Sequence, residues 1–293
     1  MPEFAPGEAK VARAPITVRP SGLSCQAEVF LGPNEMTKVA TSGLVPFTST
    51  GASQNVRLPL IMPSTEGSYH AYIDVYIEGI LIAAYRALED VVIVSVPVPV
   101  TQTFYPVGGG VILAWRDFPT SYGTVHNLTS GNIVADSAYI GQLRDEYGWM
   151  ICRGFVIFDT RSLPADSKII SAVLQIYGSR DESDTDFNVV VQKGSSGHPK
   201  TTLSKADFDY RYYSGDGGRL STIGFRVGAY NDIELNGDGI SWIKKAGAPD
   251  ITRLALRSSR DINFIAPFGF EMVEIPLGPT TYNPPRLVVT YQG

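Results

Sequence analysis

The sequence predicts an all-β protein, in which an N-terminal immunoglobulin-like sandwich is followed by a larger, jelly-roll-like β-sandwich. Three observations support this prediction. Every second residue from Tyr69 to Ile77 is apolar or aromatic, the period of a strand that is buried on one face. Similar short segments recur along the chain at intervals of about 8–12 residues. The 29 Gly and 20 Pro are typical of many strands joined by turns.

Length and composition limit the class of protein. The 293 residues are enough for two domains of about 100–200 residues each. With a net charge of −5 and a pI near 5.3, the chain lacks the excess of basic residues that is typical of nucleic-acid-binding proteins. We therefore expect no nucleic-acid partner. No apolar run approaches the roughly 18 residues of a membrane span, and residues 1–10 lack the features of a signal peptide. We therefore expect no membrane association and no secretory export.

The domain boundaries follow from changes in pattern. Residues 1–13 contain two Pro, one Gly and no periodicity, and we interpret them as an N-terminal arm. Strand-like segments fill residues 14–96, the expected immunoglobulin-like sandwich. The sequence Val-Pro-Val-Pro-Val at 96–100 favours an extended backbone, and we place a Pro-rich linker over residues 97–106. Residues 107–293 then form the jelly-roll domain.

The arm has one large apolar side chain, that of Phe4. Ordering a backbone costs about 1–2 kcal/mol per residue, so the arm needs contacts with another surface to stay in place. We expect Phe4 to make an assembly contact with a neighbouring subunit. The alternative is an arm that folds back on its own domain.

Strands are expected along both domains, with one short helix in the second. The strands of the first domain are expected at residues 26–31, 37–43, 44–48, 54–60, 69–77, 81–87 and 91–94. Those of the second are expected at 152–159, 169–177, 187–192, 229–235, 253–257 and 285–291. The helix begins after an N-cap at Asn236 or Asp238, carries Lys244 and Lys245 in its last turn and ends at Gly247.

Several segments of the second domain occur in a characteristic order. They are Arg-Gly-Phe-Val-Ile-Phe-Asp-Thr at 153–160, Ser-Leu-Pro at 162–164, and the segments 169–174, 230–236, 242–243, 256–263 and 285–291. Through them most of residues 107–293 resembles the DNRLRE-type (disaggregatase-related) jelly-roll domains. The resemblance implies a binding or structural module of polysaccharide-binding, cell-surface or phage virion proteins, and supplies no catalytic residues. Residues 14–96 look generally like Ig-like modules of phage and microbial surface proteins.

No residue pattern points to catalysis. The three histidines, His70, His126 and His198, are scattered, and none accompanies a Gly-x-Ser-x-Gly elbow. Cys25 and Cys152 fall in different domains, so we expect free thiols and no transition-metal site. We therefore expect no enzyme activity, no catalytic residue and no cofactor.

The richest acidic run lies at residues 181–186, Asp-Glu-Ser-Asp-Thr-Asp. Asp181, Asp184 and Asp186 are calcium candidates, because carboxylates on a loop suit hard cations. The twelve-residue calcium-loop pattern is missing, and the alternative is a solvated loop between strands.

Two further segments have two interpretations each. Arg257, Arg260 and Asp261 predict an arginine–carboxylate network that braces a loop together with Asp159, or else a ligand site. The Tyr-rich segment 207–213 suits a glycan or protein interface, whereas its alternation suits burial of half its rings.

These inferences lead to a non-enzymatic, structural protein of virion type, a capsid decoration or tail component. It would act through protein–protein contacts, as a homo-oligomer and with other structural subunits of a larger particle. The missing signal peptide favours the virion over the secreted members of the resembled family. The alternative is a glycan-binding adhesin at the cell surface or outside the cell.

Overall fold

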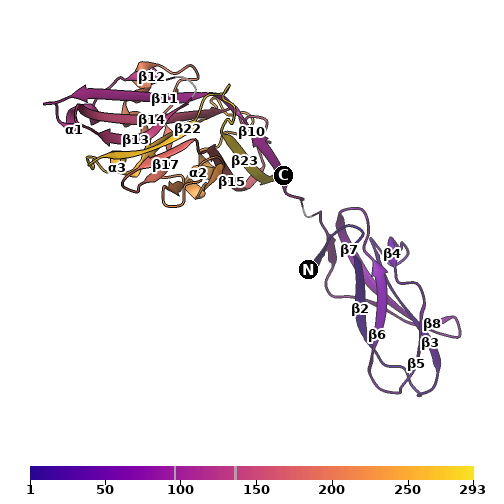
Figure 1. Ribbon diagram of the computed structural model, residues 1–293. Helices are drawn as coiled ribbons and strands as arrows, with labels where there is room; N and C mark the ends of the chain where they lie inside the picture. Colours follow the sequence, from indigo (N-terminus) through magenta and orange to yellow (C-terminus); the bar gives the residue numbers. More distant parts are fainter. Residues whose placement is uncertain (96, 135–136) are drawn as a thin grey trace. The chain divides into compact units, whose positions relative to one another are not determined.

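The computed structural model describes residues 1–95, 97–134 and 137–293 and falls into two units, Met1–Pro97 and Val98–Gly293 (Figure 1). Both units are built from β-strands, which confirms the all-β fold class. Val96, the last residue of the expected immunoglobulin-like domain, lies outside the described residues. No helix in the described ranges is long and apolar enough to cross a membrane.

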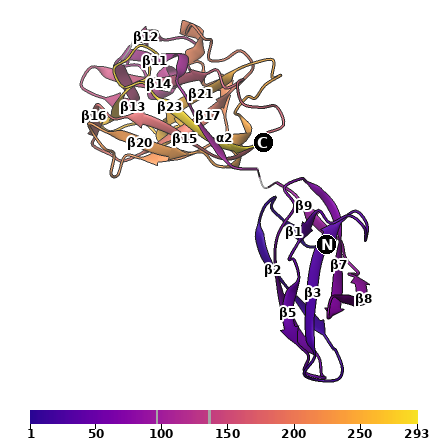
Figure 2. The same ribbon diagram turned by 90° about the vertical axis from the view of Figure 1, so that its right-hand side faces the viewer.

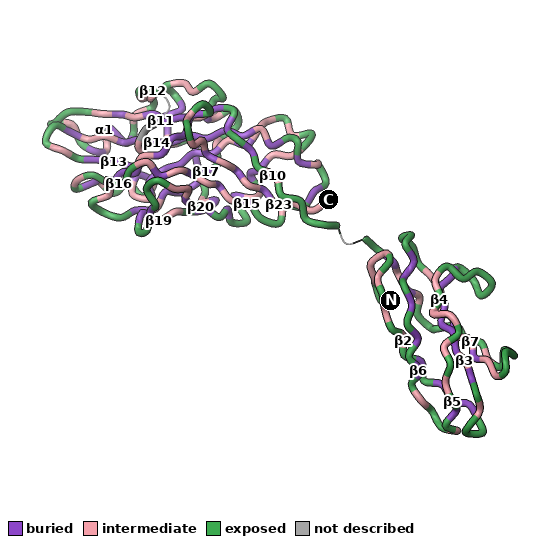
Figure 3. Tube along the Cα trace, turned by 45° about the vertical axis from the view of Figure 1, so that its right-hand side comes forward, coloured by how far each residue is buried: buried purple, intermediate pink, exposed green. Residues whose placement is uncertain are grey.

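The N-terminal unit packs two sheets face to face. Among the described residues, the larger sheet has seven strands, with the path β1-β9-β7-β3-β4, and with β5 and β8 also pairing with β3 and β7. The second sheet is the antiparallel pair of β2 (Ala9–Ile16) and β6 (Gln54–Ile61). The remaining strands are β1 (Glu3–Phe4), β3 (Ser24–Gly32), β4 (Ala40–Thr41), β5 (Val45–Thr48), β7 (Gly67–Ile77), β8 (Ile80–Arg86) and β9 (Val91–Ile93). Figure 3 shows buried residues along β3 and β6, whose apolar side chains meet between the sheets.

The prediction of an N-terminal arm is wrong. Strand β1 pairs in parallel with β9, and β2 pairs with β6 over its whole length. Phe4 is half-buried against the core of its own unit, and the Lys10 ammonium lies 5.3 Å from its ring centroid. The pattern was hidden because the inward positions of β2 include the small residues Ala12 and Ala14. The argument that Phe4 needs a neighbouring subunit therefore no longer holds, since this ring packs within its own chain.

The C-terminal unit is a larger sandwich (Figures 1 and 2). In the described part of the chain, its large sheet has ten strands with the path β16-β22-β13-β14-β21-β17-β18, and β11, β12 and β19 join it. The facing sheet has the order β10-β23-β15-β20. The large sheet contains β11 (Pro106–Asp117), β12 (Asn132–Val134), β13 (Ser137–Arg144), β14 (Gly148–Phe158), β16 (Arg180–Ser183), β17 (Asn188–Gly194), β18 (Tyr213–Ser214), β19 (Arg219–Ser221), β21 (Thr252–Ser258) and β22 (Phe270–Pro276). The facing sheet contains β10 (Val100–Phe104), β15 (Lys168–Tyr177), β20 (Tyr230–Glu234) and β23 (Arg286–Gln292).

The expected linker over residues 97–106 is too long. Strand β10 pairs with β23 from Val100 to Phe104, and β11 begins at Pro106. Phe104 is buried in the core of the C-terminal unit, so the alternation that follows the prolines belongs to this sandwich.

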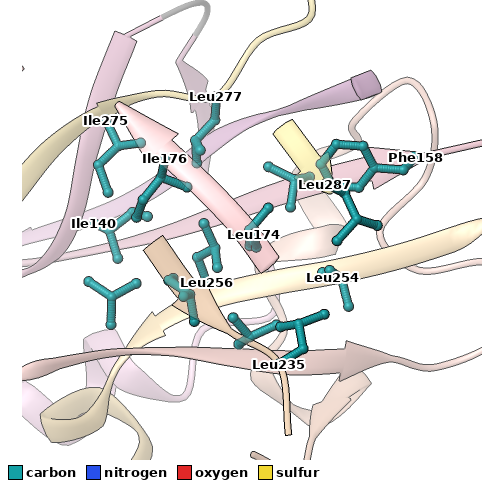
Figure 4. Close-up of a cluster of buried hydrophobic side chains, with 14 of the residues drawn as sticks. Ile140, Phe158, Leu174, Ile176, Leu235, Leu254, Leu256, Ile275, Leu277 and Leu287 are labelled. Atoms are coloured by element: carbon teal, nitrogen blue, oxygen red, sulfur yellow. The ribbon is translucent and has the colours of Figure 1, made fainter. Parts of the chain in front are cut away.

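The main core fills the space between the two sheets of the C-terminal unit. Figure 4 shows Ile140, Phe158 and Leu256 of the large sheet close to Leu174, Ile176 and Leu287 of the facing sheet. Strand β14 is buried on both faces, because a second apolar cluster lies on the outer side of the large sheet. That cluster includes Ile151 and Phe155, and short helical segments cover it: α1 (Tyr122–His126), η1 (Lys205–Phe208), η2 (Tyr210–Tyr212) and α3 (Ser259–Ile262).

Candidate functional site

The N-terminal unit exposes large apolar side chains along β8, whose sequence is Ile-Leu-Ile-Ala-Ala-Tyr-Arg. In the described residues this strand pairs only with β7, so its other edge is open (Figures 1 and 2). Ile80 is 69% exposed and Tyr85 66%, and Leu88, just beyond the strand, is fully exposed. Contiguous apolar side chains on a surface mark an interaction site more often than isolated ones do.

A groove of about 430 Å³ lies beside β8. It exists because the second sheet has only two strands in the described chain, so the inward face of β8 is not fully covered. Tyr85 and Ala83 pair with Ile73 and Val75 and share the inward face with them. The groove is lined by Ala14, Pro15, Ile16, Thr17, Val18, Ile73, Val75, Ile82, Ala83 and Tyr85, none of them charged. We call β8 together with this groove the β8 flank.

The backbone of β8 is irregular at Ile82. Leu81 pairs with Tyr76 and Ala83 with Val75, so Ile82 is an extra residue that forms a β-bulge. A bulge interrupts the regular row of edge hydrogen bonds and disfavours the addition of another strand. The β8 flank therefore offers apolar side chains for packing rather than a regular edge for sheet extension.

On the outer face of the large sheet in the C-terminal unit, Arg153 forms the centre of a buried ion network. Its Nε and Nη2 donate to the two carboxylate oxygens of Asp261 at 2.9 and 2.8 Å, and its Nη1 donates to the carbonyl of Phe208 at 2.6 Å. Arg257 Nε donates to Asp261 Oδ2 at 2.8 Å. Burial alone would raise the pKa of Asp261, but the two guanidinium groups hold it well below its usual range.

A second carboxylate extends this network. Glu271 accepts from Arg260 Nε at 2.7 Å and from the amide of Gln142 at 2.9 Å, and Gln142 accepts from the Tyr122 hydroxyl at 2.7 Å. These bonds attach α1 and α3 to the strands beneath them. The arginine–carboxylate network that the sequence predicts is therefore a brace. Asp159 is not part of it and pairs with Arg161, Nη2 to Oδ2 at 2.7 Å.

Aromatic rings lie above the network and extend to the surface. Trp149, Tyr122, Phe264 and His126 form a chain of ring contacts with centroid distances of 4.8–5.7 Å between Tyr122 and Trp149, Tyr122 and Phe264, and His126 and Phe264. Phe118 joins this chain through Trp149 at 5.7 Å. Phe264 has a left-handed backbone (φ +58°) and is 54% exposed. We call these five rings the aromatic strip; a bulky residue held at positive φ points to a function of its ring.

Most of the Tyr-rich segment 207–213 belongs to the short helical segments that cover the outer apolar cluster. Phe208 and Tyr213 are buried in the outer cluster, and the Tyr213 hydroxyl donates to the carbonyl of Asp207 at 2.8 Å. The alternation therefore buries part of the segment, as one of the two interpretations expected.

The three histidines each have a different hydrogen-bond partner. His70 Nδ1 is 2.6 Å from Asp90, His198 Nδ1 is 2.7 Å from Asp207, and His126 Nε2 is 3.0 Å from the carbonyl of Asp261. Within the described ranges, none of the three rings is hydrogen-bonded to a Ser or Cys side chain. Cys25 and Cys152 are buried free thiols. Burial raises the pKa of the Cys152 thiol to about 12.

The three calcium candidates face different partners. Asp181 accepts from the backbone and hydroxyl of Ser183, Asp184 accepts from the backbone N–H of Phe270, and Asp186 accepts from the hydroxyl of Thr222. In the part of the chain that the structure describes, no three His, Cys, Asp or Glu side chains are grouped to hold a metal ion.

Comparisons with known proteins add little. No family profile and no curated protein sequence matches the chain. One similar solved structure is from work on the structural basis for the promiscuous specificity of the carbohydrate-binding modules from the β-sandwich superfamily. It has 8% identity and a TM-score of 0.20, over 99% of this chain and 94% of that one. Another is of the infectious bursal disease virus Gt strain, with 10% identity and a TM-score of 0.17, over 97% of this chain and 60% of that one. Likeness at this level supports no argument about function.

Proposed function

We propose that the protein is a non-enzymatic structural component of a larger particle of virion type, a capsid decoration or tail subunit. In this proposal its N-terminal unit contacts further copies and other structural subunits through the β8 flank. The observation that carries the proposal is the set of exposed apolar side chains on β8 beside an uncharged groove.

The physical argument concerns the cost of this surface in water. Fully burying a Leu, Ile or Phe side chain is worth about 1.5–3 kcal/mol. Ile80, Ile82 and Tyr85 are each between 47% and 69% exposed, so covering them together would supply a substantial part of an association free energy. The fold gains nothing from leaving them uncovered.

Sedimentation equilibrium of the full chain tests the proposal. We expect wild-type protein to associate at concentrations on the order of 0.1 mM, where a matching Kd corresponds to about 5.5 kcal/mol. The double variant Ile82→Lys/Tyr85→Lys should be monomeric. Ile223→Lys, at a 73% exposed position of the C-terminal unit, is the matched control and should behave as wild type. A monomeric wild type, or a double variant that associates equally well, would contradict the proposal.

Glycan binding is the second candidate, and the aromatic strip favours it. Rigidly held, partly exposed rings stack on sugars, and polar groups beside them hydrogen-bond hydroxyls. Affinity electrophoresis in gels that contain soluble polysaccharide should show retardation that Phe264→Ala abolishes. Tyr282→Ala, at a 97% exposed ring outside the strip, should change nothing. Equal mobility of wild type and Phe264→Ala in every gel would exclude the strip as the binding surface.

A further inference from the structure

A second cavity, of about 240 Å³, lies in the C-terminal unit where β17 and β21 approach α2 (Gly237–Ser241). Its lining contains three basic side chains, Lys193, Lys244 and Arg253, and one acidic side chain, Asp250. The remaining lining residues are Gly194, Ser195, Ser196, Trp242, Pro249 and Ile251. We call it the cationic pocket. An excess of positive charge is unexpected here, because the whole chain has a net charge of −5.

The one carboxylate of the pocket is already paired. Asp250 Oδ1 accepts from Arg253 Nε at 2.9 Å and from the backbone N–H of Ile251 at 2.8 Å. Among the described residues, the ammonium groups of Lys193 and Lys244 have no ion-pair or hydrogen-bond partner. Two cations therefore line the cavity without a counter-charge from the chain.

The fold fixes the backbone position of both lysines, of which Lys193 is exposed and Lys244 half-buried. Lys193 lies in β17, between Ser214 of β18 and Leu254 of β21. The backbone N–H of Lys244 donates to the Thr252 hydroxyl at 2.9 Å, and its carbonyl accepts from the Thr160 hydroxyl at 2.6 Å. Both ammonium groups therefore extend from fixed backbone positions, so a ligand has to order only the lysine side chains.

Trp242 also lines the pocket. Its ring is fixed against Gly215 and Gly217, since a Cβ at Gly217 would lie only 2.4 Å from Trp242 Cζ3. The Trp242 side chain is largely buried, with 9% of the residue exposed, and among the described residues its indole N–H is paired with no acceptor. By contrast, Trp115 Nε1 donates to Asp117 at 2.6 Å and Trp149 Nε1 donates to the Thr120 carbonyl at 3.0 Å.

We propose that the cationic pocket binds a small oxyanion, a carboxylate or phosphate group of a ligand, through Lys193, Lys244 and the indole N–H of Trp242. These three groups donate hydrogen bonds and two are charged, which is the chemistry that recognises an oxyanion. The cavity is smaller than the roughly 300–1,000 Å³ of pockets for drug-sized ligands, and suits a single charged group or sugar unit. This inference goes beyond the proposed assembly role and does not depend on it, because the β8 flank belongs to the other unit.

The indole N–H signals of the full chain provide the test, because its three tryptophans give three separable ¹H–¹⁵N resonances. Trp242→Phe assigns the reporter signal. We expect inorganic phosphate or glucuronate to shift the Trp242 signal saturably, with weaker binding at higher salt, while the Trp115 and Trp149 signals stay in place. A response to phosphate alone identifies a phosphate-bearing ligand, and a response to glucuronate alone identifies an acidic sugar.

Charge-removing variants make the test specific. Lys193→Gln and Lys244→Gln should each weaken binding by about 10- to 150-fold, as the loss of one charge-assisted hydrogen bond implies. Lys168→Gln, at an exposed lysine of β15 outside the pocket, should bind as wild type. The proposal is overturned if neither anion moves the Trp242 signal, if neutral glucose moves it equally, or if both pocket variants bind as tightly as wild type.

Discussion

Asp261→Asn should strongly destabilise the C-terminal unit. The substitution keeps the shape of the side chain but removes its charge from beneath Arg153 and Arg257, which are 0% and 3% exposed. Asp261 accepts three hydrogen bonds from these two arginines, so the variant leaves two guanidinium groups without a counter-ion in the interior. Breaking a buried ion pair in this way costs about 3–5 kcal/mol. For a unit of this size we expect a fall in Tm of about 10 °C.

Urea unfolding followed by tryptophan fluorescence measures this loss. All three tryptophans, Trp115, Trp149 and Trp242, lie in the C-terminal unit, so the signal reports on that unit alone. Asp159→Asn is a matched control, because Asp159 also accepts two hydrogen bonds from an arginine guanidinium group but lies at the surface. The control should leave the free energy of unfolding nearly unchanged, since water screens exposed pairs. A loss of less than about 1 kcal/mol in Asp261→Asn would refute the argument that the network braces the fold.

Three other outcomes are expected. Burial lowers the pKa of His126, so the unfolded chain binds the proton more readily and stability should fall as pH drops below about 6.5; urea unfolding at several pH values should show a smaller fall in His126→Gln. Phe155→Ala should cost about 3–5 kcal/mol in the same assay, since Phe155 is fully buried, and a loss below about 1 kcal/mol would show that the outer cluster is loosely packed. Native protein should not react with a thiol reagent, because Cys25 and Cys152 are buried, whereas denatured protein should expose both thiols.

The alternation of apolar residues predicted the strands best where large side chains alternate with polar ones. The expected strand at 69–77 lies within β7, and the expected strand at 169–177 lies within β15. Strand β2 escaped prediction because its inward positions hold small residues, which give no periodic apolar signal. Pairing with β6 stabilises it, and that long-range contact is not visible in its own sequence.

The start of helix α2 could be predicted from local sequence, whereas its end could not. Asn236 caps it as expected, its side chain accepting from the backbone N–H of Gly239 at 3.0 Å. The helix ends at Ser241, earlier than predicted, because Trp242 and Ile243 leave it to join the main core. A local cap could be predicted from the sequence, but the end of the helix depends on tertiary packing.

From the sequence, Arg153 could be assigned to a strand, but its place at the centre of the buried ion network could not be predicted. Its partner Asp261 is 108 positions away, so no local spacing connects them. A signal was nevertheless present, because an arginine in the middle of an almost entirely apolar strand has to be paired if that strand is buried on both faces. Arg257, Arg260 and Asp261 could be grouped from the sequence because they surround two serines in one short segment.

The β8 flank and the cationic pocket have one physical property in common, which yields a last prediction. Each keeps side chains where the isolated fold gains nothing from them: apolar groups in water on β8, and uncompensated ammonium groups in the pocket. Residues kept for binding rather than for folding can be replaced without loss of stability. Ile82→Thr and Lys193→Gln should therefore leave the free energy of unfolding of their units unchanged or slightly higher, measured by urea unfolding with circular dichroism. If either variant loses more than about 1 kcal/mol, its residue serves the fold, and the corresponding surface loses its claim to a binding role.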